Sequence, residues 1–259
     1  MIEFKDFRFG YPGHNCICDI DVIPCDGLIT VLGNNGVGKT TFFESILGLK
    51  PHSGEIIVDY HKEIKGREFR YFSYIPQDVR CDLHIPTRDW ILHGLAQYHT
   101  FFYIPSENDM KELGRIIRWY HILPEELLDR DVSLLSGGEI RKAAIARALL
   151  QDTDYIIMDE IFSQLDPVAG KELRDIVRRL GDRGKTIFVS THDVSLTQYS
   201  ESSIYIYQDP NSGGDWRMKH IHNGALENHI ERIYGTPIKQ QLGNVCMNME
   251  DGYTLYTKK

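Results

Sequence analysis

The chain has 259 residues, of which 42% are apolar and 25% are charged, a composition that is typical of a globular protein and excludes collagen and long disordered tracts. Its 29 Lys and Arg residues against 37 Asp and Glu residues give a net charge of −8, and the absence of a dense basic block argues against a nucleic-acid partner. No apolar run approaches the roughly 20 residues that span a bilayer, and the first residues lack the pattern of a secretory signal, so we expect neither a membrane span nor secretion.

The N-terminal half is expected to alternate strands with one helix. Apolar and polar residues alternate over residues 2–9, which predicts a half-buried strand, and residues 28–32 predict a short apolar strand. Helical spacing follows over residues 41–49. Further strands are expected at residues 55–60 and 69–75.

The C-terminal half is expected to begin with an inserted helical subdomain. Between about residues 86 and 135 apolar residues recur at helical spacing. The elements expected after it are a helix at 137–150, a strand at 155–158, a helix at 168–180 and strands at 186–189 and 204–207. Strands that alternate with helices indicate a parallel sheet covered on both faces.

The tail differs in composition from the rest of the chain. Beyond residue 208 it is rich in Gly and Asn, carries no chemical motif and has one expected helix at residues 226–233. We therefore expect one domain over residues 1–207 and an extension over residues 208–259 with a regulatory or packing role.

The five cysteines, at positions 16, 18, 25, 81 and 246, are odd in number and irregularly spaced, which argues against a disulfide framework. A soft-metal site at Cys16, Cys18 and Cys25 is the alternative, but no CxxC or Cys/His pair supports it. We expect reduced, inert thiols.

A glycine-rich loop joins the strand at residues 28–32 to the helix that follows it. Its sequence over residues 33–40, Gly-Asn-Asn-Gly-Val-Gly-Lys-Thr, matches the pattern GxxxxGK[ST]. Glycines let backbone N–H groups turn toward a phosphate, and the helix N-terminus adds its positive end. We expect Lys39 to reach the β- and γ-phosphates and the Thr40 hydroxyl to bind Mg²⁺. The predicted nucleotide-binding residues of this loop are Gly33, Asn34, Asn35, Gly36, Val37, Gly38, Lys39, Thr40 and Thr41.

Two acids follow the apolar strand at residues 155–158. A strand that ends beside the phosphate-binding loop directs Asp159 at the metal, either directly or through water. Glu160, at the turn, is expected to face the γ-phosphate and to act as the general base toward water.

A second anion-binding arrangement begins the helix after residue 135. Leu134-Leu135-Ser-Gly-Gly-Glu places one serine and two glycines at a helix start. One nucleotide does not need two such sites on one chain, unless the second site serves a nucleotide held by a partner. This combination resembles the ATP-binding cassette (ABC) family, whose signature is LSGGE or LSGGQ. The resemblance implies a head-to-tail homodimer, in which each signature caps the ATP of the opposite phosphate-binding loop through Ser136, Gly137, Gly138 and Glu139.

The resemblance covers nearly the whole chain up to about residue 207, and the family's motifs occur in their usual order. It implies that Tyr11 stacks on adenine and that Gln77 touches Mg²⁺ or the attacking water. It also implies that Asp166 crosses the dimer interface and that His192 contacts the γ-phosphate and orients the water of Glu160. The implied cofactors are ATP and Mg²⁺, and the implied reaction is ATP hydrolysis.

The family implies an α/β fold of the P-loop NTPase type, with a mixed, mostly parallel sheet, an N-terminal antiparallel β subdomain and the inserted helical subdomain. The sequence departs from the family at two places. Ile161 stands where a proline usually follows the acid pair, and the segment 140–142, Ile-Arg-Lys, stands where a glutamine is common.

Four short segments resemble importers of the iron-siderophore, haem and cobalamin type. They are residues 86–94, 104–109, 129–132 and 231–238. The alternative is that they reflect packing of the helical subdomain and that another substrate is transported. Within this insertion Trp90, Phe101, Phe102 and Tyr103 either contact a permease or belong to the core.

The leading hypothesis is an importer ATPase, peripheral at the cytoplasmic face of the cell membrane. Its partners would be integral-membrane permease subunits and a substrate-binding protein. The alternatives are the ATPase of an exporter, a soluble ABC protein that acts on ribosomes or DNA, and a P-loop kinase. The single phosphate-binding loop and the acidic charge argue against the soluble ABC protein, and the serine–glycine signature argues against the kinase.

Overall fold

The computed structural model describes residues 1–11, 14–24, 27–59, 61–62, 71–98, 103–209, 215–222, 245–246 and 256–257. The chain forms two compact units. The first comprises Met1–Cys25, Ile29–Glu63 and Ser190–Lys259, and the second comprises Asp26–Leu28 and Ile64–Val189. Within the described ranges, no helix has both the length and the apolar character needed to cross a membrane.

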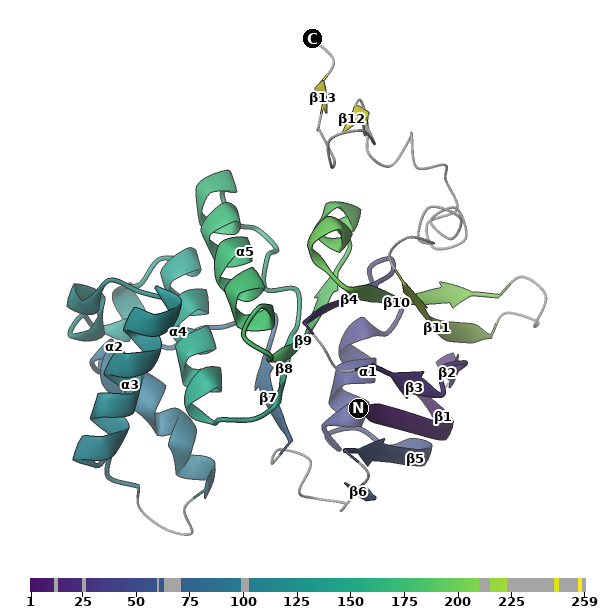
Figure 1. Ribbon diagram of the computed structural model, residues 1–259, viewed down its shortest axis with the longest axis horizontal. Coiled ribbons are helices and arrows are strands. Elements are labelled where there is room, and N and C mark those ends of the chain that lie inside the picture. Colours follow the sequence, from purple (N-terminus) through teal and green to yellow (C-terminus); the bar gives the residue numbers. More distant parts are fainter. Residues whose placement is uncertain are drawn as a thin grey trace. The chain divides into compact units, whose positions relative to one another are not determined.

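The first unit is built on a mixed sheet (Figure 1). Its strands are β1 (Ile2–Tyr11), β2 (His14–Cys18), β3 (Val22–Ile23), β4 (Leu28–Leu32), β5 (His52–Val58), β6 (His61–Lys62), β10 (Ser202–Gln208) and β11 (Trp216–His222). They follow the order β6-β5-β1-β2-β11-β10-β4, and β3 pairs with β1. The N-terminal pairs β1–β2 and β1–β5 are antiparallel, whereas β10–β4 and β11–β2 are parallel.

A bulge in β1 explains the irregular apolar pattern of the N-terminus. Phe4 and Phe7 are three residues apart, so a regular strand would place them on opposite faces. The register with β5 shifts between Lys5 and Arg8, and Asp6 has a φ of 50°. The extra residue returns Phe7 to the buried face, where its ring lies 5.1 Å from that of Phe4.

The bulged face of β1 packs on α1 (Lys39–Ile46), the helix that follows the glycine-rich loop. The rings of Phe9 and Phe42 are 5.4 Å apart, and both side chains are almost fully buried. Aromatic packing therefore fixes α1 against the N-terminal strands. The first unit also contains the short helix η5 (Val194–Tyr199), and β12 (Val245–Cys246) pairs with β13 (Tyr256–Thr257).

The second unit combines a parallel sheet with helices (Figure 1). Its strands are β7 (Phe72–Ile75), β8 (Tyr155–Met158) and β9 (Thr186–Thr191), with β8 in the middle. Its helices are α2 (Thr87–Leu92), η2 (His93–Tyr98), α3 (Glu107–Tyr120), η3 (Glu125–Leu128), η4 (Val132–Leu134), α4 (Gly137–Leu150) and α5 (Pro167–Gly181). One apolar core joins β8, α4 and α5 with the buried faces of α2 and α3.

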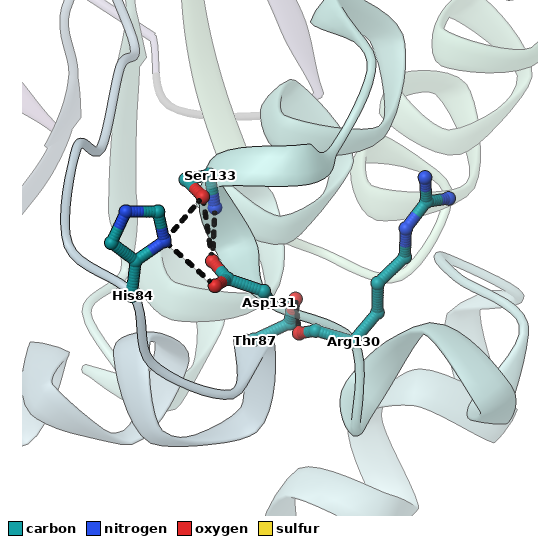
Figure 2. Close-up of polar contacts among 5 residues, drawn as sticks. All are labelled: His84, Thr87, Arg130, Asp131 and Ser133. Atoms are coloured by element: carbon teal, nitrogen blue, oxygen red, sulfur yellow. Dashed lines mark hydrogen bonds and ion pairs between the residues drawn. The ribbon is translucent and has the colours of Figure 1, made fainter.

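The two ends of the helical insertion meet in the structure. Thr87 donates from its backbone N–H and from its hydroxyl to the Arg130 carbonyl, at 2.8 and 2.9 Å. Asp131 accepts from Ser133 Oγ at 2.7 Å and contacts His84 Nδ1 at 2.9 Å (Figure 2). These contacts connect the chain before α2 to the chain before α4.

The predicted class, an α/β fold with antiparallel N-terminal strands and a helical portion, is confirmed. The structure adds β11, a strand in the tail for which no strand was predicted, and β11 pairs with β10 and β2. Helix α1 ends at Ile46, three residues earlier than predicted. The helix expected at 226–233, and Phe101 and Phe102, lie outside the described residues. Trp90 is partly buried and packs under the Arg147 guanidinium.

Candidate active site

The glycine-rich loop in the first unit has the geometry expected of a phosphate cradle. It joins β4, whose residues are all buried, to the N-terminus of α1. Gly36 and Gly38 have φ values of 81° and 104°, in the left-handed region where glycine is favoured. Gly38 is the N-cap of α1 and makes no side-chain cap, so a ligand can accept hydrogen bonds from the first N–H groups of the helix.

Lys39 lies within this loop rather than in solvent. Its side chain is buried, and its Nζ donates to the carbonyl oxygens of Gly33 and Asn34 at 2.9 and 3.2 Å. These contacts hold the ammonium group at the loop, where a triphosphate would meet it. Thr40 is half-buried and Thr41 is buried, whereas Asn34 and Asn35 are exposed.

Two further predicted residues belong to the first unit. Tyr11 is the last residue of β1 and pairs with His14 of β2. His192 directly follows β9 and is exposed. Their roles at the adenine and at the γ-phosphate stay predictions.

The predicted acids lie at the end of β8 in the second unit. Asp159 is 1% exposed, and its backbone N–H donates to the Ile75 carbonyl at 2.9 Å. At Glu160 the backbone turns sharply, with a φ of 45°. A non-glycine residue in this region is uncommon, and such strain is concentrated at functional sites.

The structure brings Gln77 and Glu160 together, 83 residues apart in the sequence. Gln77 Nε2 donates to Glu160 Oε2 at 3.4 Å. Gln77 follows β7 and Glu160 follows the neighbouring strand β8, so the carboxyl ends of two parallel strands meet at one edge. This edge joins the two groups that were predicted to act on the attacking water.

The signature segment forms a capping box at the N-terminus of α4. The Ser136 hydroxyl accepts from the Glu139 N–H at 3.3 Å, and the Ser136 N–H donates to Glu139 Oε2 at 2.8 Å. These hydrogen bonds lower the pKa of the Glu139 carboxyl below its ordinary value. A Cβ on Gly138 would lie 3.1 Å from Ala169 Cβ, so glycine lets α4 approach α5 closely.

Asp166 is the N-cap of α5. Its Oδ1 accepts from the N–H groups of Val168 and Ala169 at 2.9 and 3.0 Å, and Pro167 occupies the first helical position. The structure therefore gives this exposed aspartate a capping role, and its contact across a dimer interface stays a prediction.

The cysteines near the N-terminus are unreactive thiols. Burial raises the pKa of Cys16, and it raises the pKa of Cys18 to about 12, so both remain protonated at neutral pH. Cys25 lies outside the described residues. Elsewhere in the described ranges, no three His, Cys, Asp or Glu side chains converge on a metal-sized site.

A residue that the sequence analysis noted only as a departure lines a pocket of the second unit. Arg141, on the second turn of α4, faces a cavity of about 380 Å³ together with the residues that follow Gln77. Its substitution for the usual glutamine was visible in the sequence. The pocket was not, because it depends on how two distant segments fold together.

The chain is similar to known proteins in sequence and in fold. A family model described as ABC transporter matches residues 22–163. The manganese transport system ATP-binding protein MntA of Synechocystis sp. is 31% identical over 198 residues, 74% of each chain. The zinc transport system ATP-binding protein TroB of Treponema pallidum is 29% identical over 251 residues, 93% of this chain and 89% of that protein.

A similar fold occurs in a solved structure of a metal-chelate type ABC transporter in an inward-facing conformation. The TM-score is 0.76 at 19% identity, and the match covers 91% of this chain and 89% of that chain. At this identity the likeness shows the shared fold.

Proposed function

This chain belongs to the ABC transporter family, and from that premise we propose that it is the ATP-hydrolysing subunit of an importer of metal ions or metal chelates. As an ABC transporter ATPase, the chain binds and hydrolyses ATP. The observation that carries the proposal is the presence of two anion-binding helix starts on one chain, the loop before α1 and Ser136 at α4.

In the proposed mechanism the phosphate-binding loop and Lys39 hold the β- and γ-phosphates of ATP. Glu160 takes a proton from the attacking water while the oxygen of that water bonds to the γ-phosphorus. At the same time the bond between the γ-phosphorus and the oxygen of the leaving ADP breaks. Gln77 orients the Glu160 carboxylate through the hydrogen bond described above. His192 would contact the γ-phosphate and Tyr11 the adenine.

The residues of both units include a donor set that suits Mg²⁺, the cofactor that the family implies. Thr40, Asp159 and Gln77 offer a hydroxyl, a carboxylate and an amide oxygen, the hard ligands that this ion prefers. Asp159 is 1% exposed, so its carboxylate is shielded from bulk water. When bound with ATP, Mg²⁺ neutralises charge on the β- and γ-phosphates. We propose that these three residues hold it.

The exposed signature supports a composite site. Ser136 and Gly137 are exposed at the N-terminus of α4, with Gly138 beside them. We propose that this surface caps the γ-phosphate of ATP bound to the phosphate-binding loop of a second copy, so that two ATP molecules join a two-fold homodimer. Closure around ATP then supplies the free energy that moves a permease.

The substrate class rests on similarity to proteins that are described as transporting metals. Manganese, zinc and metal chelates recur among those descriptions, in agreement with the four sequence segments that resemble metal-chelate importers. The proposed partners are therefore integral-membrane permease subunits and a substrate-binding protein, with this chain peripheral at the cytoplasmic face.

Transport by the intact complex tests this proposal. The chain is purified with its co-purifying membrane subunits and reconstituted into vesicles, and the movement of Mn²⁺, Zn²⁺ and a ferric hydroxamate chelate is followed with ATP added on the ATPase side. ATP-dependent movement toward the ATPase side, lost in Glu160→Gln, supports import. Movement away from that side would indicate an exporter, and purification with ribosomes or DNA instead of membrane subunits would contradict a transport role.

A further inference from the structure

The pocket of about 380 Å³ in the second unit joins two segments that the proposed mechanism treats separately. One wall is the chain that directly follows Gln77, from Asp78 to Asp82. The other is the start of α4, including Gly137 and Arg141, with Ser133 before it. The pocket thus lies between the glutamine that contacts Glu160 and the signature that would cap a partner's ATP.

Arg141 has an incomplete set of hydrogen bonds in this pocket. Its Nε–H is buried and has no acceptor among the described residues, and its Nη1 makes only a long contact of 3.4 Å to the Gly137 carbonyl of its own helix. A buried donor without an acceptor is unfavourable, and a guanidinium group matches a carboxylate with two parallel hydrogen bonds. Burial lowers the pKa of Arg141, and the negative charge of Asp78 acts in the opposite direction.

Asp78 is the carboxylate within reach of this charge, and its present partner is a weak one. Arg80 Nε contacts Asp78 Oδ1 at 2.7 Å, but the two side chains are 80% and 67% exposed. Exposed ion pairs between neighbouring residues contribute little to stability, because water solvates both charges well. If Asp78 exchanged its partner Arg80 for Arg141, the buried Nε–H of Arg141 would gain an acceptor, and only a weak exposed ion pair would be lost.

We propose that Arg141 is a positioning residue for Gln77. When nucleotide binds, Asp78 leaves Arg80 and pairs with the Arg141 guanidinium. The pair fixes the chain after Gln77 to the N-terminal part of α4, so that the water-orienting glutamine and the Ser136 surface take their active positions together. This inference rests on the proposed roles of Gln77 and Ser136.

A double-mutant cycle on the full-length chain tests the pairing. Arg141→Gln and Asp78→Asn are each expected to lower kcat for ATP hydrolysis about tenfold and to leave KM for ATP within about twofold, because the pair acts on positioning and not on nucleotide affinity. The double variant should lose no more than either single variant. Arg141→Lys should recover part of the lost kcat. Arg80→Gln releases Asp78 from its present partner, so its kcat should equal or exceed that of the wild type.

Arg115→Gln is the matched control, since it removes an exposed ion pair with Glu112 on α3. Unfolding temperatures within about 2 °C of the wild type separate positioning from damage to the fold. Wild-type kcat in Arg141→Gln, or losses that add in the double variant, would overturn the pairing; additive losses would mean that Arg141 binds another group, such as inorganic phosphate. A wild-type chain without ATPase activity would instead contradict the proposed function.

Discussion

Glu160 shows how a single residue adapts a strand end to chemistry. Its φ of 45° turns the chain after the buried Asp159, and its carboxylate accepts a hydrogen bond from Gln77. Ile161, which stands where the family has proline, is fully buried in the core of the second unit. Burial of Ile161 anchors the turn from inside, so the left-handed residue before it is held in place.

Glu160→Gln tests the role of this residue as the general base. Glutamine keeps the size of the side chain and a hydrogen-bonding oxygen but cannot take a proton from water. We expect the rate of phosphate release to fall by roughly 100-fold or more, with ATP affinity retained. The control is Glu126→Gln, which changes an exposed residue of η3. This variant should hydrolyse ATP at the wild-type rate. Brisk hydrolysis by Glu160→Gln would assign the base to another residue.

At the scale of elements, the capping box of α4 predicts a pH-dependent stability. Because the pKa of Glu139 is lowered in the folded state, ionised Glu139 stabilises the fold at pH values above its unfolded pKa of 4.5. This contribution is lost as the pH falls through the folded pKa. In Glu139→Gln the hydrogen bond to Ser136 can persist, but the titration is absent. Urea unfolding should therefore give the wild type a larger free energy of unfolding than Glu139→Gln at pH 7, and the difference should shrink as the pH is lowered. A difference that does not change with pH would refute this prediction.

The close packing of β5 on the bulge in β1 allows a second prediction, which concerns Gly54. Gly54 has a φ of 86°, and a Cβ there would lie 2.4 Å from the Lys5 carbonyl oxygen. Gly54→Ala is expected to destabilise the chain by about 3 kcal/mol, from backbone strain and from a clash with backbone that cannot move aside. Gly184 has a φ of 83° with open space around it, so Gly184→Ala isolates the backbone term, expected at about 1 kcal/mol. If denaturant unfolding showed that both variants lose the same free energy of unfolding, the predicted clash at Gly54 would be contradicted.

Local patterns in the sequence predicted those elements whose cause is local. The strand at 28–32 was predicted from a short apolar run, and the loop at 33–40 from its pattern of glycines. The helix from Gly137 was predicted from the serine and glycines that begin it. Strand β11 has no such signal, because it is specified by pairing with β10 and with β2, some 200 residues away. The family resemblance predicted that Gln77 and Glu160 both act at the attacking water, but it did not predict the direct hydrogen bond between them. The Arg141 pocket was not predicted either, because its walls come from segments far apart in the sequence.

At the scale of the whole molecule, the predicted site is divided between the two units. The phosphate-binding loop, Tyr11 and His192 belong to the first unit, whereas Gln77, the acid pair and the signature belong to the second. We propose that the signature of one copy completes the site built on the loop of another. Two incomplete half-sites would then explain why one chain carries both the glycine-rich loop before α1 and the exposed Ser136 surface of α4.

Mixing two variants, each defective in one half-site, tests this claim most directly. Lys39→Ala removes the lysine of the loop, and Ser136→Arg blocks the signature; Ser136→Ala, which loses the cap without adding bulk, controls for stability. Each variant alone should be inactive, whereas their mixture should regain up to roughly a quarter of the wild-type ATPase rate, because half of the dimers are mixed and each has one intact site. A mixture as inactive as its components would contradict the composite site.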